Sequence, residues 1–366
     1  MRAKGGRWSE DPTLRVNVYM ETNVIETRAP AKPANVIVSV EGLTKSFNGT
    51  VKAVDAVSFQ VYEGEVFGFL GPNGAGKSTT INMLTTILKP TSGKATICGY
   101  DIVKDAMEVR RSVGVVPQEY TADEDLSGIE NVLLCADLYG IPRSVSKDRA
   151  WGLLKLVELD SAAKRKVDTY SGGMRRRLEL ACGLISRPRL LFLDEPTLGL
   201  DVQTRTAVWD YIKKLKEEYR MTLFMTTHYL EEADIMCDRI AVIDNGKILK
   251  LGSPKELKDS LGGDVVEIDV REDAADISDD LKKVELVKTV KKEGHTYRVM
   301  VEMGEAAAPE IIEVVRDKGI HISRISVTKP TLDEVYLAIT GRRIRDEQAN
   351  WEETMSTRMT MSRARR

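Results

Sequence analysis

The chain of 366 residues is poor in cysteine and histidine and has no long apolar run. Its four cysteines are widely spaced, without a CxxC pair or a nearby histidine cluster, which predicts reduced core thiols rather than a zinc site. No uninterrupted apolar stretch approaches the roughly 18 residues of a membrane span, and the N-terminus lacks the apolar core of a signal peptide. We therefore expect a soluble, cytoplasmic chain that reaches a membrane only through a partner.

An excess of charge of one sign is also absent. Lys plus Arg number 54 and Asp plus Glu 56, so the formal net charge is −2. This balance gives no support for nucleic-acid binding through overall charge, and no nucleic-acid partner is expected. The length allows two domains, each with its own core.

The composition changes along the chain in four steps. Residues 1–35 mix charges, Pro and Gly like a flexible leader, although 14–27 can pair as an extra strand. In 36–260, strands alternate with helices, which predicts a parallel sheet buried on both faces. Residues 261–341 follow a β-α-β-β-α-β order, the split pattern of ferredoxin-like domains, with a closing helix. The polar, Arg-rich residues 342–366 are expected to be disordered.

Several strands in 36–260 are specific predictions. They lie at 36–43, 112–117, 190–194 and 222–228, with two more in 56–71 joined by a Glu-Gly turn. Residues 239–252 read as a hairpin whose tight turn is Asn245-Gly246. Residues 126–186 are mainly helical in pattern.

The stretch "GFLGPNGAGKSTT" contains G-x-x-x-x-G-K-[ST] from Gly71 to Ser78, between a predicted strand and a predicted helix. Such a loop cradles phosphates, because its glycines let successive N–H groups converge on phosphate oxygens. Lys77 can reach the β- and γ-phosphates and the Ser78 hydroxyl can ligate Mg²⁺, with Thr79 near the α-phosphate. An incidental Gly-rich turn is the weaker reading.

The apolar run "LLFLD" predicts a buried strand that delivers Asp194 to its carboxyl end, where ligands of such sheets bind. Asp194 would hold Mg²⁺ through water, and Glu195 is the candidate to polarise the attacking water. Alone, an Asp-Glu pair after a strand is common surface chemistry; beside a phosphate loop it favours catalysis.

Three further residues fit the same site. Gln118 follows a strand and can reach Mg²⁺ or the lytic water, or be an ordinary loop amide. His228 ends the strand at 222–228 and should lie near the γ-phosphate, whereas His295 and His321 are interpreted as structural. Phe47 can stack on adenine or be a core aromatic.

The segments GPNGAGKST, the Gln118 loop, YSGGM, LLFLDEP, LGLD and TTH occur in that order and resemble the nucleotide-binding subunit of an ABC transporter. More narrowly, "YSGGMRRRLELA", "TTHYLEEAD" and "KPTLDEVYLAITG" resemble the daunorubicin-resistance type. Its members are separate ATPase chains that pair with a membrane permease, usually for export, and carry an extra C-terminal domain. The resemblance implies a P-loop NTPase cassette with a parallel core sheet, an antiparallel β subdomain and a helical subdomain, followed by a small α+β ferredoxin-like domain.

The resemblance also implies roles for individual residues. It assigns Glu195 as catalytic base, His228 as γ-phosphate sensor and Asp201 to a dimer interface. The Mg²⁺ ligands would be Ser78, Gln118 and Asp194. The nucleotide's phosphates would lie against Gly71, Asn73, Gly74, Ala75, Gly76, Lys77, Ser78 and Thr79. The γ-phosphate of ATP held by a second subunit would be bound by Ser171, Gly172 and Gly173.

The chain departs from the common LSGGQ signature at Tyr170 and Met174, but neither change removes the serine hydroxyl or the glycine amides. Phe47 stands where many relatives have Tyr. In the signature helix, Ser171 would be the cap, and both glycines would leave their amides open to a phosphate. The three arginines that follow cannot all face one way, so at most one or two would approach the nucleotide or a neighbouring carboxylate, and the rest would form a solvated face.

The implied assembly is a homodimer, or a heterodimer with a related ATPase, on the cytoplasmic face of the membrane beside a permease. Residues 119–140 would form the docking surface, although their apolar pattern also suits a core. Two alternatives are a soluble ABC ATPase of translation or repair and a kinase-like P-loop enzyme. A single cassette without sustained heptads argues against the first, and the signature segment and TTH argue against the second.

Overall fold

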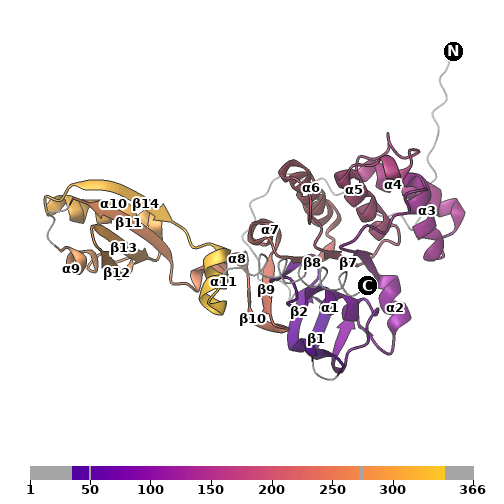
Figure 1. The fold of residues 1–366 in the computed structure, drawn as a ribbon, viewed down its shortest axis with the longest axis horizontal. Coiled ribbons are helices and arrows are strands. Elements are labelled where there is room, and N and C mark those ends of the chain that lie inside the picture. The colour runs from indigo at the N-terminus through magenta and orange to yellow at the C-terminus, as the bar shows by residue number, and fades with distance from the viewer. Residues whose placement is uncertain (1–34, 49–50, 272–275, 343–366) are drawn as a thin grey trace, which may run out of the picture. The chain divides into compact units, whose positions relative to one another are not determined.

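The computed structural model describes residues 35–48, 51–271 and 276–342. The leader with its predicted extra strand, and the polar tail, lie outside these ranges apart from single residues at their edges. The described chain opens with an antiparallel four-stranded sheet in the order β2-β1-β4-β5 (Figure 1). Its strands are β1 Val36–Phe47, β2 Val51–Tyr62, β4 Ser92–Ile97 and β5 Tyr100–Asp101. This is the antiparallel β subdomain implied by the resemblance.

A six-stranded sheet in the order β10-β9-β3-β8-β7-β6 forms the centre of the cassette (Figure 1). Its strands are β3 Val66–Leu70, β6 Val113–Val116, β7 Leu190–Asp194, β8 Thr222–Thr227, β9 Arg239–Asp244 and β10 Lys247–Gly252. All neighbours are parallel except β9 and β10, which form the predicted hairpin. Asn245 and Gly246 supply its turn with φ of 47° and 77°, the left-handed values that such a turn requires. The predicted parallel core sheet is confirmed.

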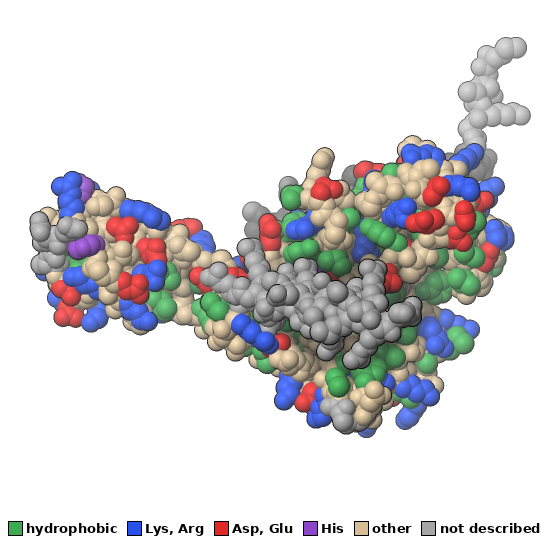
Figure 2. All heavy atoms as spheres, viewed as in Figure 1, with side chains coloured by type: hydrophobic (Ala, Val, Ile, Leu, Met, Phe, Trp, Pro, Cys, Tyr) green, Lys and Arg blue, Asp and Glu red, His purple; other side chains and the backbone are tan. Residues whose placement is uncertain are grey.

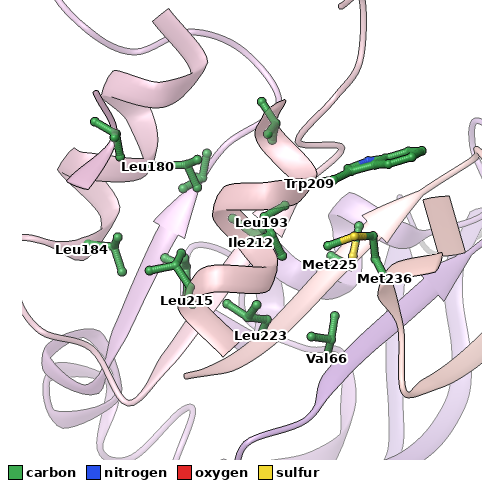
Figure 3. Packing of buried hydrophobic residues seen from close by; sticks show 14 of the residues in the cluster. Val66, Leu180, Leu184, Leu193, Trp209, Ile212, Leu215, Leu223, Met225 and Met236 are labelled. Carbon is green, nitrogen blue, oxygen red and sulfur yellow. The ribbon is translucent and has the colours of Figure 1, made fainter. Parts of the chain in front are cut away.

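Every residue of β3, β7 and β8 is buried, because both faces of the sheet are covered. Alternate residues of β7 point to opposite sides: Leu191 and Leu193 belong to one hydrophobic cluster, Leu190 and Phe192 to another. On the first side, α6 (Val202–Tyr219) packs over the sheet, as Figure 3 shows for Ile212 near Leu193. On the other side lie α1 (Lys77–Leu84) and the antiparallel sheet.

The predicted helical region contains α3 (Gly128–Leu138), α4 (Arg143–Leu156), the short 3-10 turn η2 (Val167–Thr169) and α5 (Gly172–Leu184). The remaining cassette helices are α2 (Ala106–Ser112), α7 (Leu230–Met236) and α8 (Pro254–Asp259). Ser127 and Glu130 form a capping box at the start of α3, which fixes where that helix begins.

The C-terminal elements run β11 (Asp264–Val270), α9 (Ser278–Leu281), β12 (Val287–Glu293), β13 (Thr296–Val301), α10 (Gly304–Asp317) and β14 (Ile322–Thr328). Their sheet has the order β12-β13-β11-β14 with antiparallel neighbours, and a hydrophobic cluster of its own. This is the strand order of the split β-α-β pattern. The closing helix α11 (Leu332–Thr340) differs from these elements, because its Leu332, Val335 and Tyr336 belong to the cassette's cluster.

On the face shown in Figure 2, Lys and Arg side chains are interspersed with Asp and Glu. Among the described residues, no helix combines the length and the apolar character needed to cross a bilayer.

Candidate functional site

Four neighbouring parallel strands end at the same edge of the central sheet. The chain leaves β3 into Gly71, β6 into the Gln118 segment, β7 into Glu195 and β8 into His228. Because the carboxyl ends of adjacent parallel strands lie together, residues distant in sequence meet here.

The loop between β3 and α1 is shaped by close backbone contacts. Gly74 and Gly76 have φ of 81° and 102°, values that L side chains rarely adopt. A Cβ on Gly71 would lie 2.1 Å from the Ile243 carbonyl oxygen, and one on Gly76 would lie 2.3 Å from that of Ala53. Asn73 and Ala75 lie within this loop, and Thr79 lies in the first turn of α1. The glycines therefore let the loop pack closely against the chain behind it.

Lys77 is buried, with only 4% of its surface exposed. Its Nζ donates to the carbonyl oxygens of Gly71 at 2.8 Å and Pro72 at 3.0 Å, and lies 3.0 Å from Glu195 Oε1. The ammonium group therefore lies between the phosphate loop and Glu195, the residue that follows β7.

The Glu195 carboxylate is buried between the Lys77 ammonium group and the His228 imidazole. Its Oε2 lies 2.9 Å from His228 Nδ1. Burial alone would raise the pKa of Glu195, but the hydrogen bond with His228 and the charge of Lys77 lower it to about 2. Since an ionised carboxylate only accepts hydrogen bonds, His228 donates from Nδ1. Its Nε2 is then the ring nitrogen left for another partner.

Asp194 lies beside Ser78 and Thr226. The Ser78 hydroxyl donates to Asp194 Oδ1 at 3.1 Å, and the Thr226 hydroxyl donates to the same oxygen at 2.5 Å. Burial raises the pKa of Asp194, while these two hydrogen bonds oppose the rise. A hydroxyl and a carboxylate oxygen side by side are the ligand chemistry that Mg²⁺ prefers, so these residues fit that ion.

Gln118 and Phe47 stand apart from this cluster. Gln118 is exposed, and its link to the site is through its carbonyl oxygen, which accepts from Arg176 at 3.1 Å. Phe47, at the end of β1, is 41% exposed, with Lys45 Nζ 5.3 Å from its ring centroid. It is not a core aromatic, so stacking on adenine stays a prediction.

The signature segment opens α5. Ser171 caps the helix by accepting from Met174 N at 3.3 Å, and both Ser171 and Gly172 are exposed. Gly173 is buried: a Cβ there would lie 2.4 Å from Thr204 Cγ2. Only Gly172 therefore has the exposure that was expected of both glycines, and phosphate binding by the signature stays a prediction. At Gly173, the missing side chain lets α5 approach α6.

Asp201 caps α6, accepting from Thr204 N at 2.9 Å and from the Thr204 hydroxyl at 2.7 Å. These hydrogen bonds lower the pKa of the exposed Asp201. Thr204 thus touches both Asp201 and Gly173, so the LGLD turn and the signature lie side by side. Among the described residues, no hydrogen bond or ion pair joins Ser171 to the cluster of Lys77, Asp194 and Glu195.

The expectation for the three arginines of α5 is met at Arg175, which pairs with a carboxylate, and is wrong at Arg176, which is not solvated. Arg175 pairs with Glu124, Arg177 donates to the Val157 carbonyl at 3.2 Å, and Arg176 is fully buried. Burial lowers the pKa of Arg176.

Two residues that hydrogen-bond at or near the site, Thr226 and Glu179, were not identified from the sequence. Thr226 could have been found, because it stands two residues before His228 on a strand ending at the site. The Glu179 carboxylate accepts from Thr121 N at 2.6 Å, a tertiary contact that no local pattern signals.

Known proteins show the same combination of elements. Residues 54–198 match the ABC transporter family, and residues 252–340 match the C-terminal domain of DrrA1-3-like ATP-binding proteins. The doxorubicin resistance ATP-binding protein DrrA of Mycobacterium tuberculosis is 41% identical over 83% of this chain and 93% of its own length. The daunorubicin resistance ATP-binding protein DrrA3 of Streptomyces coeruleorubidus is 38% identical, covering 86% and 99%. The cassette MJ0796, solved as a dimer bound to ADP and Pi, has a TM-score of 0.53 at 28% identity, covering 59% of this chain and 98% of that one.

The cassette fold and its phosphate loop define a nucleotide-binding ATPase of the ABC class. With relatives matching across both the cassette and the C-terminal domain, the chain belongs to the daunorubicin-resistance type of ABC transporter ATP-binding subunits. Its activity is ATP hydrolysis coupled to transport, and the sequence-based assignment is confirmed at that level. The alternative of an ABC ATPase without a permease is not favoured.

Proposed function

We propose that the chain hydrolyses Mg²⁺-bound ATP within a head-to-tail pair of subunits, and that closing and opening of the pair drives a separate permease in the export direction. The observation that carries this proposal is the buried group of Lys77, Glu195 and His228 beside Ser78 and Asp194. Relatives named for doxorubicin and daunorubicin resistance support export, while the permease selects the substrate.

The phosphate loop binds the nucleotide. Its amides and the N-terminus of α1 supply positive potential, and Lys77 approaches the β- and γ-phosphates from its position under the loop. Ser78 and Asp194, whose oxygens lie 3.1 Å apart, would hold the metal ion. Gln118 lies outside this pair, so its part as a further ligand rests on the family resemblance alone. The bound ion would neutralise charge developing on the phosphates.

Glu195 is the group that accepts a proton from the attacking water. Its low pKa keeps it ionised at neutral pH, which is the protonation state that a general base needs, while the same low pKa makes it a weak base in the geometry described. His228 donates from Nδ1 to Glu195 and presents Nε2 toward the γ-phosphate, so the two residues orient one another.

A second subunit completes each site. Ser171 and Gly172 are exposed at the N-terminus of a 13-residue helix, where a phosphate is attracted by free N–H groups and the helix dipole. In the part of the chain that the structure describes, no hydrogen bond or ion pair joins them to the catalytic group, which agrees with a contact to ATP bound by the other subunit. Such pairing is two-fold and self-complementary, and it buries two nucleotides together. The dimeric form of MJ0796 supports this arrangement.

The purified chain tests the catalytic assignment directly. Glu195→Gln keeps the shape of the side chain but removes the base, so kcat should fall about 100-fold or more while ATP still binds. The control is Glu217→Gln, which changes an exposed carboxylate on α6 in the same way and should hydrolyse ATP like the parent. If Glu195→Gln hydrolysed ATP at the parental rate, Glu195 would not be the base.

A further inference from the structure

Arg176 lies one and a half turns into α5 and is almost completely buried, with 1% of its surface exposed. Its guanidinium donates to three main-chain carbonyl oxygens: Pro117 at 2.6 Å, Gln118 at 3.1 Å and Glu195 at 3.2 Å. Burying a charge is costly unless it is well hydrogen-bonded. These bonds offset part of that cost, because Arg176 Nε has no hydrogen-bond partner among the described residues. The Arg176 side chain thus holds two loops of the site, the one after β6 and the one after β7.

The hydrogen bond from Arg176 to the Glu195 carbonyl matters because the main chain at Glu195 has a conformation that is rare for a non-glycine residue. Its φ is 48°, in the left-handed region that a non-glycine residue enters at a cost of about 1–3 kcal/mol. The Glu195 N–H donates to the Thr226 hydroxyl at 3.0 Å, and the Glu195 carbonyl accepts from Arg176. The same carbonyl also accepts from Leu198 N at 3.1 Å. One main-chain group is therefore held by the sheet, and the other by α5 together with the turn after β7.

The segment after β6 is held by the same helix. One turn beyond Arg176, the Glu179 carboxylate accepts from Thr121 N at 2.6 Å and Ala122 N at 2.9 Å. The Tyr120 hydroxyl donates to the Gly172 carbonyl at 3.3 Å. Since Ser171 caps α5, one helix connects the exposed signature to both the Gln118 segment and the Glu195 carbonyl.

We infer that Arg176 is a positioning residue that ties the conformation of Glu195 to the position of the signature helix in the same chain. This inference rests on the proposed function, in which Ser171 contacts the ATP held by the second subunit. Docking of α5 onto that nucleotide then sets the Glu195 backbone of its own site. Binding at one site thereby prepares hydrolysis at the other.

The test compares Arg176→Gln with Arg176→Lys, and with Arg175→Gln as a matched control on the same helix. Arg175 pairs with Glu124 and donates to the Tyr170 and Asp168 carbonyls, so it contacts neither Glu195 nor Gln118. Arg176→Gln should lower kcat about 10- to 100-fold with a KM for ATP within about threefold, because misplacing a catalytic group costs rate rather than binding. Arg176→Lys, which keeps a donor and the charge, should recover part of the rate.

A second readout separates positioning from simple stabilisation. Combined with Glu195→Gln, the Arg176→Gln change should leave ATP-dependent dimerisation intact, so that the pair closes without being poised to react. The inference is overturned if Arg176→Gln hydrolyses ATP like Arg175→Gln, if KM and dimerisation fail together with kcat, or if Arg176→Lys gives no recovery. An unmutated chain that neither dimerises nor hydrolyses ATP would instead refute the proposed function.

Discussion

Lys77 and Glu195 form a buried ion pair, and taking two charges out of water costs free energy of folding. Such a pair is weak evidence for stability, because well-packed apolar residues often serve a fold as well or better. Both charges nevertheless lie in the catalytic group, Lys77 under the phosphate loop and Glu195 beside His228. The chemistry proposed for the site, rather than the free energy of folding, accounts for keeping them.

The phosphate-loop glycines differ in what surrounds them, which gives a residue-level prediction. Gly76→Ala should lower ATP affinity and the thermal unfolding midpoint more than Gly74→Ala. Both changes strain a left-handed backbone by about 1–2 kcal/mol, but only the Gly76 Cβ would meet the Ala53 carbonyl oxygen, at 2.3 Å, whereas Gly74 faces open space. Thermal unfolding and titration with a fluorescent ATP analogue measure the two effects. Equal losses in both variants would show that loop strain, not the contact with Ala53, dominates.

The residues of motifs that stand at strand ends could be assigned to the site from the sequence, because the ends of the strands determine where these residues lie. Asp194 and His228 follow apolar runs whose carboxyl ends must meet in a parallel sheet. The partners of Arg176 and Gly173 could not be predicted, since Pro117 and Thr204 are distant in sequence and nothing local marks them. Tertiary contacts of this kind need the fold itself.

At the scale of elements, strands were easier to predict than helices. Runs such as "LLFLD" match β7 because a strand covered on both faces is uniformly apolar. The first helix of the predicted β-α-β-β-α-β order is very short, with α9 covering only Ser278–Leu281. Helix α11 packs its apolar residues into the cassette cluster, a choice of partner that amphipathicity alone does not specify.

Helix α3 presents apolar side chains in two directions, which bears on permease docking. Val132 and Ala136 are buried, while Leu134 and Leu138, one turn apart on another face, are 43% and 80% exposed. The alternative reading, in which the apolar residues of this segment all belong to the core, therefore does not account for Leu134 and Leu138. An exposed apolar edge on a helix suits a partner's surface.

Leu138→Glu should weaken recovery of the chain with membranes from its native cell while leaving the ATPase of the purified chain near the parental rate. The added charge would have to be buried at the docking surface, and α3 lies outside the catalytic group. Ser144→Glu, at an exposed polar position on α4, is the control for charge alone. Membrane co-sedimentation followed by identification of the captured permease makes the measurement. Equal recovery of both variants would place docking elsewhere.

At the scale of the whole molecule, the proposed function divides each site between two subunits. The phosphate loop with Glu195 forms one half, and the exposed Ser171 and Gly172 form the other. Two copies related by a two-fold axis satisfy both halves at once. ATP is then part of the interface, so the association of subunits should depend on the nucleotide.

The direct measurement is the mass of the Glu195→Gln chain in solution, by size-exclusion chromatography with light scattering, in Mg²⁺ with ATP or ADP. We predict a dimer with ATP and a monomer with ADP, and a monomer in both when Ser171→Arg is added, because the arginine blocks the approach of the phosphate. Ser171→Arg alone should still bind ATP at its own phosphate loop, which shows that the variant is folded. A dimer that persists with Ser171→Arg, or a mass that does not respond to ATP, would contradict the head-to-tail site.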